Sequence, residues 1–142
     1  MDMGGGGGAG CSDDSYGGGA GAGGGIVMLI TKALTITGSV ASNGGGGDGY
    51  KGDPWYSQAC GGGVAGGSVI VICGTASLGA SKISAVGASG GSQQYAQTGG
   101  AGGNGIVAVH HYGIISGTTS PTFTDISDTS LREKSGMLQQ IG

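Results

Sequence analysis

Residues 17–30 read GGGAGAGGGIVMLI, and residues 34–47 read LTITGSVASNGGGG. The first stretch is a glycine tract followed by a short aliphatic run, and the second alternates apolar and polar residues before another glycine tract. Leu34, Ile36 and Val40 alternate with threonine and serine at the two-residue period of a strand with one buried face. The aliphatic run is short and begins beside glycine, which disfavours a helix. Together these stretches predict β-strands separated by glycine tracts.

The chain contains an internal repeat of about forty residues. A shift of 43 residues places Ile26 on Val69 and Val40 on Ile83, and a third, truncated copy follows at an offset of 37. Each unit consists of a glycine tract, an apolar strand, a second strand and a turn into the next tract. We therefore predict a glycine-rich repeat domain over residues 1–117, with units of about 17–60, 61–98 and 99–117, and a linker with a C-terminal docking segment over 118–142.

The glycine tracts have two interpretations. They are either flexible loops at strand ends or ordered, three-per-turn extended helices of the polyglycine II type, which pack side by side. Such close backbone approach requires residues without a Cβ. We favour the ordered helices because the tract lengths recur with the strands. In that arrangement the small non-glycine residues would point outward: Ala20, Ala22, Ala65 and Ala101.

The first strand of each unit is apolar on both faces, as in residues 69–73, which fits burial in a stack or at a subunit interface. The expected fold class is therefore all-β. It is a glycine-rich, solenoid-like repeat structure with polyglycine-II-type segments, assembled as a homo-oligomer.

Composition excludes several classes of protein. The 142 residues include 39 glycines but only 2 prolines, without the collagen period. Five Lys and Arg against eight Asp and Glu give a net charge of -3, so there is no basic surface for nucleic acid or for an anionic membrane. No apolar run is long enough to span a bilayer, and no export signal is visible at the N-terminus. This favours a component of a particle released by lysis.

The cysteines and histidines match no metal-binding pattern. Cys11 and Cys60 stand before glycine tracts in successive repeats, so stacking could join them in a disulfide, but free or buried thiols are the favoured interpretation. Cys73 ends an apolar run. His110 and His111 have no nucleophile or carboxylate in a recognisable catalytic relation, and we expect them to be surface residues at a strand end. We predict no catalytic site, no metal site and no cofactor.

The order of motifs resembles the glycine-rich repeat proteins of phage tail fibres and adhesins, and related bacterial surface proteins. The resemblance covers about residues 4–117 and rests on units such as GGGAGAGGGIVMLI followed by LTITGSVASNGGGG. It implies β-structure with glycine-rich, polyglycine-II segments that serves as a rigid projection or a receptor-binding tip. Proteins of this group are frequently trimeric, so the resemblance favours a trimer as the homo-oligomer. This chain is short and carries a C-terminal extension in place of a long N-terminal attachment domain.

Aromatic residues in the loops between repeats are the candidates for a binding site. The loop that follows the first unit holds Tyr50, Trp55 and Tyr56, and the equivalent loops hold Tyr16 and Tyr95. Exposed aromatic residues on loops often contact partners. These residues could form one tip that recognises carbohydrate or protein. The alternative is that Trp55 plugs the end of the glycine stack.

The C-terminal segment has the pattern of a short helix. Ser130 and Glu133 fit a capping box, and the apolar side would consist of Leu131, Leu138 and Ile141. A helix of this length is marginal alone, so we expect it to dock onto another subunit or another protein.

These features predict a non-enzymatic structural protein of a bacteriophage, a homo-oligomeric glycine-rich fibre or adhesin at the virion surface. Its partners would be other copies of itself, other virion proteins through the C-terminal segment, and a host surface glycan or protein. The first alternative is a capsid decoration protein. A bacterial surface filament subunit or an ice-binding protein, at an extracellular or cell surface, is the second. Nucleic-acid binding and membrane insertion are not expected.

Overall fold

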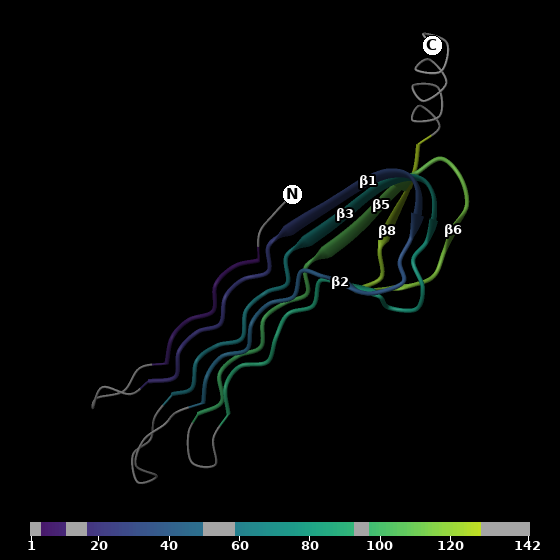
Figure 1. Cartoon of the computed structure of the whole chain (residues 1–142). Coiled ribbons are helices and arrows are strands. Elements are labelled where there is room, and N and C mark those ends of the chain that lie inside the picture. The colour runs from purple at the N-terminus through teal and green to yellow at the C-terminus, as the bar shows by residue number, and fades with distance from the viewer. Residues whose placement is uncertain (1–3, 11–16, 50–58, 93–96, 129–142) are drawn as a thin grey trace. The chain divides into compact units, whose positions relative to one another are not determined.

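The computed structural model describes residues 4–10, 17–49, 59–92 and 97–128. Regular secondary structure in these ranges is entirely β, which confirms the predicted all-β class, and no helix that could span a membrane occurs there. Figure 1 labels the strands, which are β1 (Ile26–Thr35), β2 (Val40–Ala41), β3 (Ser68–Ser77), β4 (Ile83–Ser84), β5 (Ile106–His111), β6 (Ile115–Ser116), β7 (Thr119–Ser120) and β8 (Thr124–Ser127). The predicted C-terminal helix lies outside the described residues.

The strands form two sheets. The larger has the order β1-β3-β5-β8, with β6 also paired to β3, and the smaller has the order β2-β4-β7. Strand β2 pairs with β4 in parallel with Val40 opposite Ile83, which is the pair that the repeat superposes. Strand β4 in turn places Ile83 opposite Thr119 of β7. The register of the β2–β4 pair is therefore that of the sequence repeat, whereas β4 and β7 pair at an offset of 36 residues, one less than that of the third copy.

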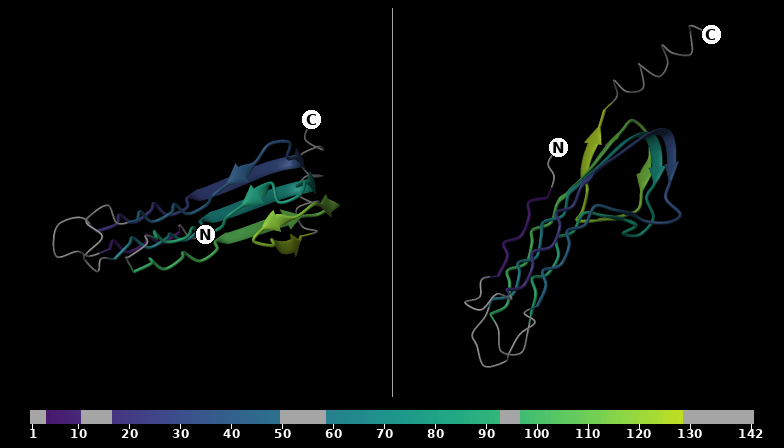
Figure 2. Two further views of the ribbon diagram at one scale, coloured as in Figure 1. Left: turned by 90° about the horizontal axis from the view of Figure 1, so that it is seen from below. Right: turned by 60° about the vertical axis from the view of Figure 1, so that its left-hand side comes forward.

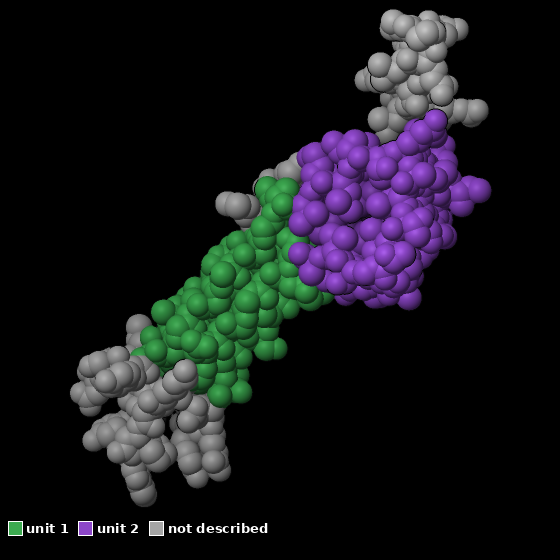
Figure 3. All heavy atoms as spheres, in the orientation of Figure 1, with its two compact units in different colours: residues 1–26, 42–68, 85–105 green, residues 27–41, 69–84, 106–142 purple. Residues whose placement is uncertain are grey.

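Two compact units divide the chain across its repeats (Figure 3). Unit 1 contains residues 1–26, 42–68 and 85–105, and unit 2 contains residues 27–41, 69–84 and 106–142. Each repeat thus contributes its glycine tracts to unit 1 and its strands to unit 2. The sequence analysis expected domains that are each continuous in the chain. The two compact units are instead discontinuous, and they separate the glycine tracts from the strands.

The core of unit 2 is formed by small and medium-sized aliphatic side chains. Its fully buried members come from β3, β4, β5 and the turn after β3: Val69, Val71, Leu78, Ile83, Val107 and Val109. Strand β3 lies between β1 and β5 in the sheet, and its side chains are largely buried on both faces. Strand β1 lies at the edge of the sheet, and its residues Ile26, Met28 and Ile30 stay exposed. The apolar first strand is therefore buried in the second and third repeats but not in the first.

Two boundaries differ from those predicted. Residues 26–37, expected to form two strands, contain one continuous strand β1, because residues 31–33 include no glycine or proline to end it. Residues 118–128, expected to be part of a linker, contain β7 and β8. Strand β8 pairs with β5, with His111 opposite Ser127, and so covers an edge that would otherwise be open.

Unit 1 contains six extended segments, which run side by side in Figure 2: segment 1 (4–10), segment 2 (17–25), segment 3 (42–49), segment 4 (59–67), segment 5 (85–92) and segment 6 (97–105). Segments 2, 4 and 6 precede the long strands in the chain, and segments 3 and 5 follow the short ones. Hydrogen bonds between neighbouring segments join backbone N–H and carbonyl groups. These bonds satisfy backbone groups that a structure without strands or helices would otherwise leave unpaired.

Segment 4 lies at the centre of unit 1 and bonds to all five other segments. Its N–H groups donate in three-residue steps, with N···O distances of 2.7 to 3.2 Å: Cys60, Gly63 and Gly66 to Gln97, Gly100 and Gly103 of segment 6, and Gly61, Val64 and Gly67 to Asp48, Gly45 and Ser42 of segment 3. Gly62 donates to Gly8 of segment 1 at 2.8 Å, and segments 2 and 5 donate to segment 4. Three-residue spacing means that successive residues face different neighbours.

Close packing, not an unusual backbone dihedral, requires glycine in these segments. The described glycines with positive φ are Gly79 and Gly117, and neither lies in a segment. A Cβ added to Gly61 would overlap the carbonyl oxygen of Gly19, and one added to Gly105 would overlap that of Gly67. A side chain would therefore force the neighbouring backbones apart.

The side chains that do occur in the segments mostly lie at the surface. Ala20, Ala22 and Ala101 are exposed, as predicted, whereas Ala65 of segment 4 is half-buried. Val64 is fully buried and Cys60 is nearly so. The central segment thus encloses two side chains larger than alanine.

Candidate functional site

The residues that flank the aromatic connections lie together at one end of unit 1. Backbone hydrogen bonds of 2.9 to 3.0 Å join them: Gly10 to Gly18, Asp48 to Gly19, Cys60 to Gln97, Gly61 to Asp48, and Gly99 to Gly91. A bridge between Ala59 and Gln97 adds a further link. All six segments contribute to this network, so the described residues on either side of connections 11–16, 50–58 and 93–96 lie at the same end of the segments.

The predicted binding residues belong to these three connections: Tyr16, Tyr50, Trp55, Tyr56 and Tyr95. They lie outside the described residues, so the prediction that they form one tip stays a prediction. Their chain neighbours, however, are held within one hydrogen-bonded cluster. The anchor points required for a shared tip are therefore present.

Asp48 is the charged residue of the described part of this end. Its backbone donates to Gly19 and accepts from Gly61, while its side chain is exposed. Within the described residues there is no group of three or more His, Cys, Asp or Glu side chains that could hold a metal ion. The chemistry available at the described end is that of exposed backbone groups, the Asp48 carboxylate and neutral polar side chains such as those of Gln97 and Thr98.

Cys60 is a free, buried thiol, only 5% exposed, as the favoured interpretation expected, and the possible Cys11–Cys60 disulfide is not formed. The physical reason is the direction in which its face of segment 4 points. By the three-residue repeat Cys60 shares this face with Gly63 and Gly66, and a Cβ on either of these would meet segment 5. Cys11 follows segment 1 in the chain and lies outside the described residues.

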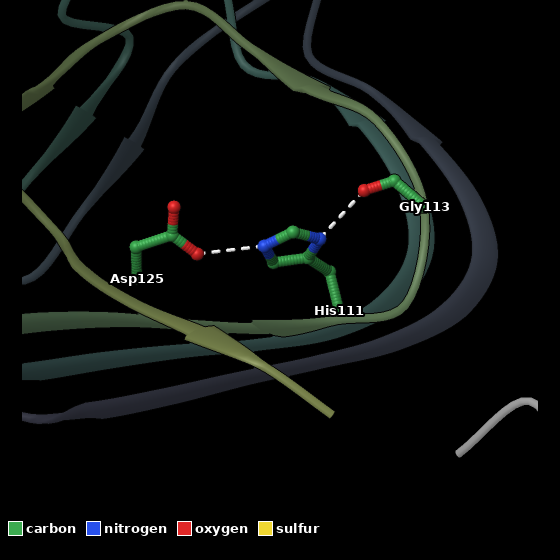
Figure 4. Close-up of polar contacts among 3 residues, drawn as sticks. All are labelled: His111, Gly113 and Asp125. Atoms are coloured by element: carbon green, nitrogen blue, oxygen red, sulfur yellow. Dashed lines mark hydrogen bonds and ion pairs between the residues drawn. The ribbon is translucent and has the colours of Figure 1, made fainter. Parts of the chain in front are cut away.

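His111 forms a polar link between β5 and β8 that the sequence analysis missed (Figure 4). Its Nδ1 lies 2.6 Å from the carbonyl oxygen of Gly113, and its Nε2 lies 2.6 Å from Oδ1 of Asp125. Both partners accept hydrogen bonds, so each ring nitrogen can donate to its partner when it carries a proton. Parallel pairing of β8 with β5 brings Asp125 to this position, and only knowledge of that pairing would have revealed it.

The geometry makes His111 a structural clamp. It lies at a strand end, as expected, but its side chain is only 12% exposed, so the expectation of a surface histidine was wrong for this residue. Both ring nitrogens are occupied by the carbonyl and the carboxylate, which leaves neither free to activate a nucleophile. His110 is half-buried on the same strand.

A second exposed surface lies on β1. Ile26, Met28 and Ile30 alternate along the strand and so share one face of it. Ile30 is the most exposed of the three, at 70%. The predicted docking residues Leu131, Leu138 and Ile141 lie outside the described residues.

Comparison of the chain with protein-family models, curated proteins and solved structures finds no match.

Proposed function

We propose that this protein is a non-enzymatic structural component of a phage virion, a glycine-rich fibre or adhesin whose aromatic connections contact the host surface. The observation that carries the proposal is that the described residues flanking all three aromatic connections are hydrogen-bonded together at the same end of the segments. Binding residues are commonly placed on loops that a rigid scaffold positions. Here the scaffold is the set of glycine segments.

Unit 1 in this proposal is a polyglycine-II-type bundle. Three-residue steps in the hydrogen bonds of segment 4 support this, because an extended helix with three residues per turn presents every third residue to the same neighbour. The equal registers of sequence repeat and β2–β4 pairing support a solenoid-like stack. A bundle of this kind is stiff, since each segment is tied to several others.

Tyrosine and tryptophan suit recognition at such a tip. They offer large contact areas with few rotatable bonds, and each has a polar group for hydrogen bonding. The ligand class in this proposal is a surface glycan or an exposed protein loop of the host. The virion end of the module would be the C-terminal segment with Leu131, Leu138 and Ile141.

The exposed face of β1 favours assembly into a homo-oligomer, for which we propose a trimer. Three alternating large apolar side chains on an edge strand are typical of a surface that a partner covers. Binding by several copies would also raise the avidity for a repetitive host surface.

A cell-binding assay tests the proposed function. Fluorescently labelled protein should bind host bacteria, and the double substitution Trp55→Ala with Tyr56→Ala should reduce binding at least about tenfold, which corresponds to one or two interface hot spots. Ile114→Ala, which removes an exposed apolar side chain outside both β1 and the aromatic connections, is the matched control and should bind like wild type. Unchanged binding by the double variant would refute the role of the aromatic connections. Immunogold labelling of the capsid in place of a fibre would favour the decoration protein.

A further inference from the structure

Two Asn–Gly pairs contact the beginning of segment 5. Asn43 and Gly44 lie in segment 3, and Asn104 and Gly105 lie in segment 6. In a flexible chain this dipeptide is especially prone to deamidation, in which the asparagine side chain loses ammonia. Glycine has no Cβ to hinder its own backbone nitrogen from attacking the preceding side chain. The chain therefore carries a chemically reactive pair in each of two segments beside segment 5.

The side chains of both asparagines accept hydrogen bonds from segment 5. Oδ1 of Asn43 accepts from the N–H of Val86 at 3.0 Å, and Oδ1 of Asn104 accepts from the N–H of Gly87 at 3.3 Å. Neither N–H group has a backbone acceptor among the described residues. The two amides thus supply acceptors that the backbone lacks where segment 5 begins, which accounts for asparagine at these positions.

Packing against segment 4 requires the glycine that follows each asparagine. A Cβ added to Gly44 would overlap the carbonyl oxygen of Val64, and one added to Gly105 would overlap that of Gly67. Any larger residue would slow deamidation, but none fits at these two positions. Asparagine is needed for one contact and glycine for the next, so the fold itself imposes the reactive pair twice.

The attacking nitrogen is held by a hydrogen bond in both pairs. The N–H of Gly44 donates to the carbonyl of Val86 at 2.9 Å, and the N–H of Gly105 donates to that of Ala85 at 2.7 Å. Deamidation requires this nitrogen to lose its proton and to approach the asparagine side chain, which is itself bonded to segment 5. Both asparagines are exposed, so water is not excluded. Protection from the reaction depends on the alignment of the segments.

We infer that Asn43 and Asn104 are sites of spontaneous deamidation, which the aligned segments hold inactive and an unaligned chain exposes. In the reaction the backbone nitrogen of the next residue attacks Cγ of the asparagine. A C–N bond forms, and the Cγ–Nδ2 bond breaks with release of ammonia, which carries away the proton of the backbone amide. Water then opens the resulting five-membered imide. Aspartate or isoaspartate results, according to which carbonyl carbon the water attacks.

Isoaspartate is incompatible with the observed contacts. Its main chain runs through the side-chain carbon, which adds one backbone atom and about 1.5 Å. A three-per-turn extended helix rises about 3.1 Å per residue, so the residues that follow would be half a step out of register. At Asn43 this displaces the N–H of Gly44 from the carbonyl of Val86. A chain that stays unaligned long enough to react therefore cannot rebuild these contacts.

The inference goes beyond the proposed function and does not depend on it. Peptide mapping by mass spectrometry, after incubation in mildly alkaline buffer, tests it. In the folded protein both asparagines should deamidate at least about tenfold more slowly than in synthetic peptides of residues 40–47 and 101–108, because the reaction must wait for local opening. In guanidinium chloride the chain should react at the peptide rate. Equal rates in the folded protein and the peptides would overturn the inference.

Gly87→Ala tests whether the contact with segment 5 is the cause. The added Cβ would overlap the carbonyl oxygens of Gly102 and Gly103 in segment 6, so it separates segment 5 from segment 6 rather than from segment 3. Asn104 should then deamidate about tenfold faster than in wild type, and Asn43 should change less. Gly103→Ala, whose Cβ has no neighbour within 4 Å, is the matched control and should leave both rates unchanged.

An unchanged rate at Asn104 in folded Gly87→Ala would refute the role of segment 5. Should this variant fail to fold, both asparagines react at the peptide rate, and the comparison of wild type with the peptides decides.

A refolding experiment under reducing conditions tests the consequence. Wild type unfolded briefly in guanidinium chloride should recover its circular dichroism on dilution, whereas protein held unfolded at alkaline pH until isoaspartate has formed should not. The double variant Asn43→Asp with Asn104→Asp keeps a normal backbone and an acceptor oxygen at each position, so it should refold after the same long incubation. Full recovery of the isoaspartate-containing protein, or failure of the double variant, would contradict the role of the added backbone atom.

Discussion

Unit 1 and unit 2 are built from the same three repeats but are stabilised in opposite ways. In unit 1 the contacts are hydrogen bonds between backbones that touch because side chains are absent, as at Gly61 beside Gly19. In unit 2 aliphatic side chains such as Leu78 and Ile83 fill the core. Added side-chain atoms should therefore destabilise unit 1, whereas removal of side-chain atoms should destabilise unit 2.

The largest effect is expected from Gly61→Val. The new Cβ would overlap a backbone carbonyl, which cannot rotate away as a side chain can, so the loss should exceed the roughly 3 kcal/mol typical of strong overpacking. We expect no cooperative unfolding transition of unit 1 in urea, followed by circular dichroism. Gly5→Ala, where the added Cβ has no neighbour within 4 Å, is the control and should unfold like wild type. A stable Gly61→Val protein would show that the segments are not closely packed.

Removal of core atoms from unit 2 should have the next largest effect. Leu78→Ala leaves a cavity at a fully buried position and should lower the free energy of unfolding by about 3 kcal/mol. Ile30→Ala removes a side chain that is mostly exposed and should change it by less than about 0.5 kcal/mol. Equal effects of the two substitutions in urea titrations would contradict the described core.

Loss of the clamp between β5 and β8 should have a smaller effect. Asp125→Asn removes the charge that accepts from His111, but the carboxylate is 63% exposed, so we expect a cost of about 1 kcal/mol. A double-mutant cycle with His111→Ala measures the coupling between the two residues by thermal unfolding. Additive effects of the two substitutions would show that the contact contributes nothing.

The smallest effect concerns the pH dependence of unit 2. Burial raises the pKa of the Cys73 thiol above its ordinary value. The unfolded chain therefore releases this proton first, so stability is unchanged below the ordinary thiol pKa and decreases as the pH rises above it, until the folded-state pKa is reached. Urea titrations from pH 7 to pH 10 should show this decrease in wild type but less of it in Cys73→Ala. An identical pH profile for both proteins would contradict the expectation.

The sequence was informative wherever a short-range pattern had a direct structural consequence. The alternation of Leu34 and Ile36 with threonine predicted one half-buried face, and the structure has those residues half-buried between exposed ones. The repeat offset predicted the pairing of Val40 with Ile83. In both cases one local rule determines the result.

Features that depend on long-range pairing could not be predicted. Asp125 meets His111 only because β8 adds to the edge of β5, and no spacing rule links the two residues in the sequence. Similarly, Cys60 shares with Gly63 and Gly66 the face of segment 4 that lies against segment 5. This follows from the three-residue spacing of the hydrogen bonds, which the sequence does not reveal. The direction of a side chain in an extended segment changes completely with a shift of one residue.

The backbone-only bonding of unit 1 has a consequence for how the protein folds. A glycine segment that slips by three residues along its neighbour restores almost the same hydrogen bonds, so the tracts by themselves define their alignment poorly. The buried side chains of Val64 and Cys60 favour one alignment over the others, because a slip would move them to different surroundings. The strands that precede or follow each tract also fix where the tract begins. Correct assembly of the glycine bundle should therefore depend on prior formation of the sheets, with the tracts aligning outward from strands whose register is already set.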